Sequence, residues 1–364
     1  MPKRHRSEED RQERALRDAL RSQHRHRLGE ALWRSPATGF LDASMRVKAY
    51  RLLLDLQSTR FAQVWPVSIV NQEVIDKANR QLTDQLERDV PRSTSFFPAS
   101  DETASTNHLA QLQTLLYTHF KDNPTRRYGY VQGLHAIGAI VLRAVEDLEV
   151  AQQVVDRLFP GFLLDLCIDL GHAMTWCHLA FFLAAVSDAA DKKSCREHLG
   201  HALRERLVEP TSILSWPLTL FGQAKQASVR HHQTVLILLD AVLAGGPPFV
   251  LYLMASLLQH ALTHLATMDH NVLMDYPAYL SAQNELPGKS AWEGILNHAR
   301  HLQKKWPVKD VLAMATITAK DDTTAQWSSL LGLPPRQMRP VSLPAWFDSL
   351  PLLLFGDHIL TIKG

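Results

Sequence analysis

The chain has 364 residues, of which 46% are hydrophobic, enough for a sizeable core in one large domain or two ordinary ones. Its 39 lysines and arginines nearly balance its 37 aspartates and glutamates, so overall charge favours neither a nucleic acid nor a membrane surface as partner. The three cysteines show no CxxC spacing, which indicates reduced thiols and a cytosolic location rather than a disulfide framework.

Residues 1–30 form a charged segment that we expect to be mobile. This segment has no apolar stretch of the secretory-signal kind, so we expect the chain to start in the cytosol. Its sparse leucines, Leu16 and Leu20, predict a frayed, solvated helix, and packed structure is expected to begin near Ala31. Short basic runs such as KRHR are interrupted by acidic residues, and a phosphate or import-receptor contact there stays an open alternative.

Beyond residue 31, apolar residues recur every three or four positions. No convincing run of alternating strand pattern follows, so the sequence predicts an all-α domain without appreciable β-sheet. One helix is predicted from Ser44 to Leu56 and the next from Asn71 to Asp89. The apolar stripe of the second helix is formed by Ile75, Ala78, Leu82 and Leu86.

A carboxylate, Asp89, continues this stripe on the face that should be buried. Pro91 disfavours helical geometry at the preceding Val90, so we expect the helix to end there and Arg92 to lie on the following loop. An ion pair that caps the helix end would explain Asp89 and Arg92 without any further function. The two residues alone leave this simple explanation open.

The stretch NPTRRYGYVQGLHAIG, residues 123–138, joins two predicted helices. The earlier helix follows a loop, is capped by Thr106 or Asn107, and ends at Asn123-Pro124. The later one is strongly apolar, starts near Leu134 and runs to about Leu148 by its spacing. Gln132 therefore lies between glycines at a loop-to-helix junction, where its amide either points outward or makes a local hydrogen bond.

Two later regions raise functional alternatives that their patterns do not favour. The apolar run from Val235 to Leu258 is long enough for a membrane span, but Asp240 and the GGPP sequence divide it, which predicts two core helices. The region from Phe159 to Val186 contains potential metal ligands, and their spacing matches no standard metal site, so no metal is expected. These potential ligands are Asp165, Asp169, His172, Cys177 and His178.

The last part of the chain begins with a loop that holds Asp269, His270 and Asp275, followed by final domain helices near Trp292 to Leu302. Residues 308–364 are predicted to form a linker and a short apolar tail. The longest charge-free stretch, Ser349 to Gly356, is too short to cross a bilayer. The tail suits either a peripheral membrane contact or packing on the domain or on a partner.

Two motifs in this order resemble the TBC domain of Rab GTPase-activating proteins. The first is LxxDxxR at Leu86, Asp89 and Arg92, and the second is NP…YxYxQG, which ends at Tyr130 to Gly133. The resemblance extends from Leu41 to Pro307, with Arg46 and Tyr50 similar to the family's opening arginine and aromatic residue. GLHAIG and LSWPLTLFG look most like the endoplasmic-reticulum-associated, early-secretory subgroup, although Ala136 stands where that subgroup often has aspartate.

The resemblance implies an all-α domain of two helical subdomains over residues 31–307 and a catalytic role for two side chains. Arg92 would be an arginine finger positioned by Asp89, because an arginine delivered in trans stabilises charge on the transferring phosphoryl group. Gln132 would orient the attacking water through its amide. Tyr130 would support the loop, and Gly133 would allow its close approach to the nucleotide.

The implied function is activation of a Rab-family GTPase in vesicle traffic between endoplasmic reticulum and Golgi, at the cytosolic face of those membranes. The chain would contribute catalytic residues to its partner rather than act as an independent hydrolase. GTP and Mg²⁺ would arrive with the GTPase, so no cofactor, metal or nucleic acid is expected to bind the chain itself. The alternative is a non-catalytic adaptor that binds a Rab or a trafficking complex through the same surface.

Overall fold

A computed structural model describes most of residues 8–307, and every regular element in the described part is a helix, which confirms the all-α class. The described residues are 8–34, 36, 39–40, 42–56, 71–97, 102–121, 128–163, 166–167, 170–186, 210–223, 229–246, 249–264, 270–283 and 291–307. The predicted linker and tail, residues 308–364, lie outside the described residues.

The helices fall into an N-terminal and a C-terminal series. The first series is α1 (Glu8–Arg21), α2 (Arg25–Leu32), α3 (Ala43–Leu53), α4 (Gln72–Asp89), the 3₁₀ helix η3 (Val90–Phe96), α5 (Glu102–Phe120), α6 (Leu134–Val145) and α7 (Leu148–Arg157). The second is the π-helical turn η5 (Leu158–Phe162), α9 (Leu170–Val186), η6 (Pro210–Ile213), α11 (Ser215–Leu218), α12 (Val229–Gly245), α13 (Phe249–His264), α14 (His270–Met274), α15 (Tyr276–Gln283) and α16 (Ala291–Lys305).

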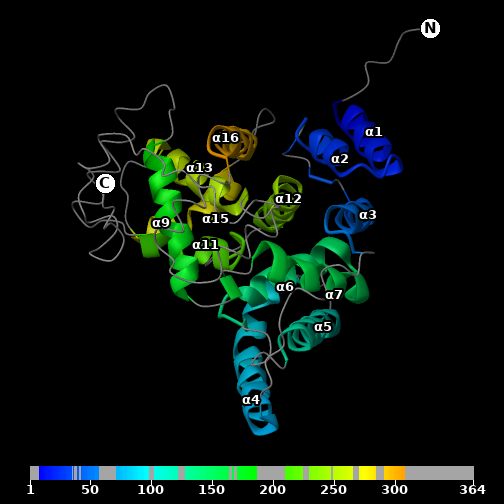
Figure 1. The fold of residues 1–364 in the computed structure, drawn as a ribbon, viewed down its shortest axis with the longest axis vertical. Coiled ribbons are helices and arrows are strands. Elements are labelled where there is room, and N and C mark those ends of the chain that lie inside the picture. Colours follow the sequence, from blue (N-terminus) through cyan, green and yellow to red (C-terminus); the bar gives the residue numbers. More distant parts are fainter. Residues whose placement is uncertain are drawn as a thin grey trace.

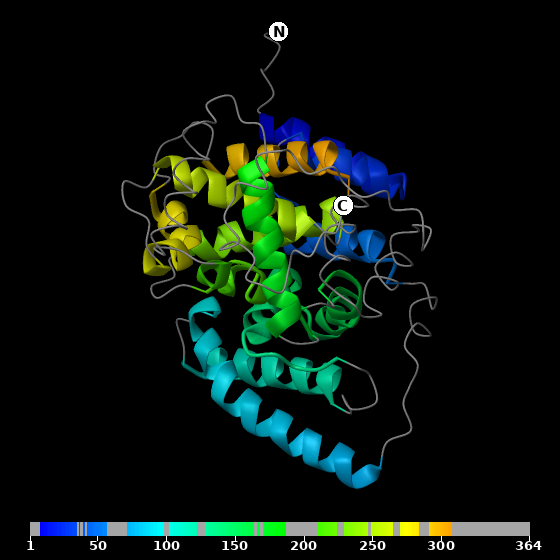
Figure 2. The ribbon, with the colours of Figure 1, turned by 60° about the vertical axis from the view of Figure 1, so that its left-hand side comes forward.

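The two series occupy different parts of the molecule. In Figure 1, α4 and α5 lie at the lower end, α6 and α7 lie in the middle, and α9, α13 and α16 gather at the upper left. The turned view in Figure 2 shows α4 and α5 side by side beneath the rest of the fold. The middle of the molecule, where α6 contacts both α5 and α12, is therefore where the two parts meet.

Helix α13 is the centre of the C-terminal part. It packs against both α9 and α16, and the side chains of residues 249–259 are all buried. A helix that is apolar around its whole circumference needs neighbours on every side, which explains this central place. The structure confirms that the long apolar run forms two helices, α12 and α13, and none of the described helices has the length and apolar character needed to cross a membrane.

The N-terminal helices pack on the fold, contrary to the expectation that packing begins near Ala31. Leu16 of α1 and Leu28 of α2 are both fully buried. Helix α1 contacts α2 and α3, and these helices cover its narrow apolar stripe. A mostly charged helix can therefore pack on the fold through a few apolar side chains. Arg300 also links α16 to the N-terminal helices. It forms an ion pair with Glu30 of α2, and its Cζ atom lies 5.0 Å from the centre of the Trp33 ring.

Helix boundaries near the predicted site follow local capping. The predicted start of α4 is confirmed, because the Asn71 side chain accepts a hydrogen bond from the amide of Glu73 at 2.9 Å. The expected cap at Thr106 or Asn107 is wrong, since α5 already begins at Glu102.

Two further boundaries differ from the prediction. α6 stops at Val145 rather than Leu148, because Glu146 is left-handed (φ 54°) and Asp147 caps α7. The predicted loop around His270 and Asp275 is instead the pair α14 and α15, which meet at Asp275. Asn123-Pro124, the predicted helix end, lies outside the described residues.

Candidate functional site

The end of α4 holds the predicted Asp89 in a buried position. Asp89 is 3% exposed, and each of its carboxylate oxygens accepts one hydrogen bond. Oδ1 accepts from Nη1 of Arg92 at 2.9 Å, and Oδ2 accepts from the hydroxyl of Tyr130 at 3.0 Å. A buried carboxylate needs such partners because it has lost its water, so Asp89 has a specific role in holding both residues.

Arg92 lies within a short helix rather than on a loop, so that part of the prediction is wrong. Val90 keeps helical angles (φ −58°, ψ −40°), and the chain continues directly into η3. Pro91 is tolerated because it stands in the first turn of η3, where an amide proton has no helical partner. The η3 turn consequently places Arg92 three residues after Asp89, within reach of its carboxylate.

The Arg92 side chain is anchored but accessible. It is 56% exposed, whereas the side chain of Asp89 is 5% exposed. A guanidinium has five N–H donors, and the hydrogen bond to Asp89 uses only one of them. The group can therefore be held in place and still donate to a partner molecule.

Tyr130 connects Asp89 to α6. Besides its bond to Asp89, its hydroxyl lies 3.1 Å from Nδ1 of His135, and its ring packs edge-on against Phe120. Burial and the neighbouring Asp89 raise the pKa of Tyr130 well above its ordinary value, which keeps the hydroxyl protonated. Burial lowers the pKa of His135, which favours the neutral imidazole.

Gln132 and Gly133 form the turn that leads into α6. Gln132 is exposed, as predicted for a loop-to-helix junction. Gly133 has φ +111°, and a Cβ at this position would lie 3.2 Å from both Cβ and the carbonyl oxygen of Leu218. The backbone conformation and the close approach of residue 218 both require glycine. Gly133 thus brings the Gln132 turn against the segment around α11.

A cleft of about 460 Å³ brings the two predicted catalytic residues, Arg92 and Gln132, together. Gly133 and His135 line the same cleft, whereas Asp89 and Tyr130 do not line it and reach it through the hydrogen bond from Arg92 to Asp89. A larger groove of about 780 Å³ between α1 and α3 contains none of the predicted site residues. The cleft is the candidate site because it brings Arg92 and Gln132 together, although it is smaller than the groove between α1 and α3.

The opposite wall of the cleft is the segment 214–223, whose structural role the sequence pattern did not predict. Leu220 and Phe221 both have positive φ (47° and 62°) although neither is glycine. Their side chains are buried, and the Phe221 amide donates to the carbonyl of Trp216 at 2.7 Å, so packing holds the strained turn. Thr219 and Gln223, on either side of this turn, both line the cleft, and the sequence signal for the turn was the compact block LSWPLTLFG.

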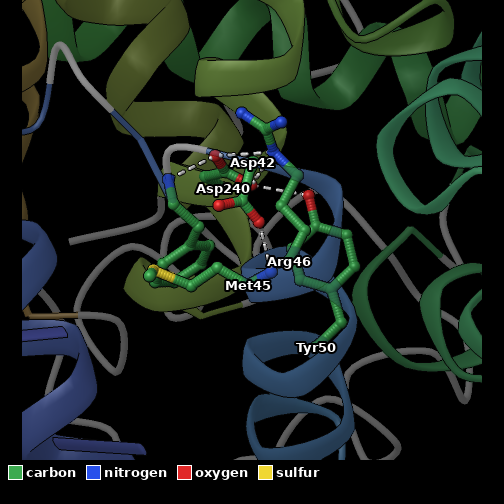
Figure 3. Close-up of polar contacts among 6 residues, drawn as sticks. Asp42, Met45, Arg46, Tyr50 and Asp240 are labelled. Carbon is green, nitrogen blue, oxygen red and sulfur yellow. Dashed lines mark hydrogen bonds and ion pairs between the residues drawn. The ribbon is translucent and has the colours of Figure 1, made fainter. Parts of the chain in front are cut away.

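A second polar cluster surrounds Asp240 of α12, which is fully buried (Figure 3). Nε of Arg46 donates to both carboxylate oxygens at 3.1 Å, the Tyr50 hydroxyl donates at 2.6 Å and the Phe40 amide at 2.9 Å. Burial raises the pKa of Asp240, and these three donors oppose the shift. Gly39 is required beside it, because a Cβ there would lie 2.4 Å from Oδ2 of Asp240.

This cluster fastens α3 to α12 across the fold. Neither Arg46 nor Asp240 lines the cleft, so the cluster supports the domain rather than contacting a partner there. The sequence pattern placed Tyr50 on the inward face of its helix and Asp240 as a break in an apolar run, and the family resemblance included both of them and Arg46. Nothing in the local pattern paired residues 46 and 240.

Among the described residues, no group of three histidines, cysteines or acidic residues is placed to hold a metal ion. Asp165 and Asp169 lie outside the described residues, as do the side chains of His172 and His178. Cys177 is buried, and burial raises the pKa of its thiol well above the ordinary value, as expected of a packed, unreactive side chain.

Comparison with known families gives one match. Residues 43–265, which make up more than half of the chain, match the family model described as the Rab-GTPase-TBC domain. No curated protein matches the chain. The matched region contains the whole cleft, from Arg92 to Gln223, and both ends of the Arg46–Asp240 ion pair.

Proposed function

The chain belongs to the Rab-GTPase-TBC family, and on that premise we propose that it stimulates GTP hydrolysis by a Rab-family GTPase through Arg92 and Gln132. The observation that carries the proposal is that these two side chains share one cleft. The chain supplies catalytic groups to the GTPase and is not a hydrolase by itself.

Arg92 stabilises the transition state of phosphoryl transfer. Negative charge builds on the oxygens of the transferring group, and an arginine supplied in trans accelerates hydrolysis by roughly 10³- to 10⁵-fold. Asp89 supports this role because it restricts the long Arg92 side chain before the GTPase arrives. Less conformational entropy is then lost when Arg92 reaches the phosphate.

Gln132 orients the attacking water. Its amide offers both a donor and an acceptor, so it can hold a water molecule and a neighbouring backbone group at once. The exposed turn presents this side chain to the partner, while Gly133 allows the turn to sit against Leu218. Gln132 thereby replaces a water-positioning glutamine of the GTPase.

The partner brings the nucleotide and Mg²⁺, and the chain needs no cofactor of its own. We further propose that the substrate is an early-secretory Rab, met at the cytosolic face of the endoplasmic reticulum or early Golgi. This rests on the resemblance of GLHAIG and LSWPLTLFG to that subgroup, and both blocks contribute residues to the cleft. A membrane contact by the C-terminal tail stays a prediction.

Single-turnover GTP hydrolysis across a panel of purified Rabs tests the proposal. We expect wild type to accelerate at least one Rab and Arg92→Ala to lower that stimulation by about 10³-fold or more. Arg92→Lys should recover little, because lysine lacks the planar fork of donors. Gln132→Ala should lower stimulation by about 10²- to 10³-fold.

Two exposed residues outside the cleft serve as matched controls. Arg88→Ala removes an arginine one turn before Arg92, and Gln111→Ala removes a glutamine from α5. Both controls should retain full stimulation. If Arg92→Ala and Gln132→Ala also retain it, the assignment of catalytic residues is wrong. If wild type binds a Rab but stimulates none, the chain is a non-catalytic adaptor.

A further inference from the structure

His135 has no part in the mechanism above, although it contacts Tyr130, which donates to the Asp89 carboxylate that holds Arg92. It lies in the first turn of α6, is 8% exposed and borders the cleft. Its Nδ1 atom lies 3.1 Å from the Tyr130 hydroxyl oxygen, and that hydroxyl also bonds Oδ2 of Asp89 at 3.0 Å.

Counting the protons assigns the direction of each hydrogen bond. Asp89, beside the Arg92 guanidinium, accepts through both carboxylate oxygens, so the single Tyr130 proton points to Oδ2. The Tyr130 oxygen can then only accept from His135, and Nδ1 must carry a proton. The ordered chain runs from His135 to Tyr130, then to Asp89, which accepts at its other oxygen from Arg92.

We propose that His135 is a positioning residue that, as the Nδ1–H tautomer, orients Tyr130 toward Asp89 and thereby fixes Arg92. This inference rests on the proposed role of Arg92. His135 itself touches neither nucleotide nor water in this assignment. Its effect is to occupy the Tyr130 oxygen, so that the Tyr130 hydroxyl proton stays directed at Oδ2 of Asp89 and the carboxylate stays in one rotamer.

The environment of the ring supports this assignment. Burial lowers the pKa of His135, so the ring carries one proton near pH 7 and the tautomer is a defined state. The raised pKa of the half-buried Tyr130 keeps its hydroxyl a donor to Asp89. Arg92 depends on this support because its side chain is 56% exposed and its hydrogen bond to Asp89 comes from a single nitrogen.

Kinetics with Rab·GTP as the substrate tests the positioning role. We expect His135→Leu to lower kcat by about 10- to 100-fold with little change in KM, the range that follows from a small misplacement of a catalytic group. His135→Asn should restore most of kcat, because its amide N–H occupies the place of Nδ1–H. In the Tyr130→Phe background His135→Leu should have no further effect, since both act through one chain of bonds.

His298→Leu is the matched control. His298 of α16 is also part-buried, has a pKa lowered by burial and bonds Ser256 at 3.1 Å, but it does not line the cleft. Its substitution should leave kcat unchanged even if stability falls. A fall in kcat that is equal for His298→Leu and His135→Leu, or that His135→Asn does not reverse, would overturn the positioning role.

Nitrogen NMR of histidine-labelled full-length protein gives a readout independent of GTPase stimulation. The His135 signals, identified by their loss in His135→Asn, should show a protonated Nδ1 and an unprotonated Nε2. In Tyr130→Phe the ring should change to the Nε2–H form. An Nε2–H tautomer in wild type would refute the hydrogen-bond order, whether or not any Rab is stimulated. The expected tautomer with an unchanged kcat for His135→Leu would refute only the positioning role.

Discussion

Removing the buried carboxylate of Asp240 should destabilise the fold strongly without altering the cleft. Asp240→Ala leaves the Arg46 guanidinium, 7% exposed in the native fold, without its counter-charge. Breaking a buried ion pair in this way costs about 3–5 kcal/mol. Phe40 and Tyr50 lose their acceptor as well, which adds about 1–3 kcal/mol for each donor that stays unpaired. These terms overlap, because water that enters the space satisfies some donors.

We therefore expect the free energy of unfolding to fall by at least about 3 kcal/mol. Guanidinium unfolding followed by tryptophan fluorescence measures this as a lower midpoint at an unchanged m-value. The informative partner variant is Arg46→Met with Asp240→Leu, which removes both charges together. A well-packed apolar pair often replaces a buried ion pair at little cost, so the double variant should be more stable than Asp240→Ala alone.

A specific result would refute this reasoning. If Asp240→Ala lowers the free energy of unfolding by less than about 1 kcal/mol at an unchanged m-value, the charge of Arg46 is not buried against Asp240 as described. Because neither residue lines the cleft, the folded fraction of Asp240→Ala should still stimulate its Rab with normal kcat. A large loss of kcat in fully folded protein would show that the cluster acts on the site.

Three further predictions concern other parts of the fold. His231 is buried, and burial lowers its pKa in the folded protein from the ordinary 6.5 to about 4. Between these two pH values the imidazole is protonated in the unfolded chain but neutral in the folded one. Stability from this group is fully present above about pH 6.5 and is lost as the pH falls toward 4, by up to about 3 kcal/mol; His231→Gln should flatten the pH dependence of the unfolding midpoint. Gly133→Ala should lower both the melting temperature and GTPase stimulation, because φ +111° and the contact with Leu218 strain any side chain by about 1–3 kcal/mol. Leu16→Ala should lower the free energy of unfolding by about 2–5 kcal/mol if α1 is packed as described, and a change below about 0.5 kcal/mol would mean that α1 does not contribute to the core.

Several features of this protein were readable from the sequence because they depend on neighbours along the chain. The span of α4, the start of α6 and the separation of α12 from α13 follow from apolar spacing and local capping, which need no distant partner. The buried position of Asp89 was predictable for the same reason, since it continues the stripe of Leu82 and Leu86. The family match supports the interpretation of the two motifs, whereas the catalytic roles of Arg92 and Gln132 stay predictions.

Local patterns failed where a distant residue determined the outcome. Packing of α1 depends on α2 and α3 covering a stripe that looks too sparse by itself. The left-handed turn at Leu220 and Phe221 exists because buried contacts hold it against local preference. The prediction at Val90 failed for a local reason instead, because Pro91 fits the first turn of η3 and the chain continues into that 3₁₀ helix.

The sequence by itself therefore determined the all-α class and the residues on which a mechanism can be built. Only the tertiary structure decided how those residues are joined. Tyr130 lies 41 positions from Asp89, and Arg46 lies 194 positions from Asp240. Helical periodicity specifies which face of a helix is buried but carries no information on which distant face covers it. The cleft, the hydrogen bonds of Asp89 and the buried ion pair all depend on which helix faces pack against each other, and this is determined only when the whole chain folds.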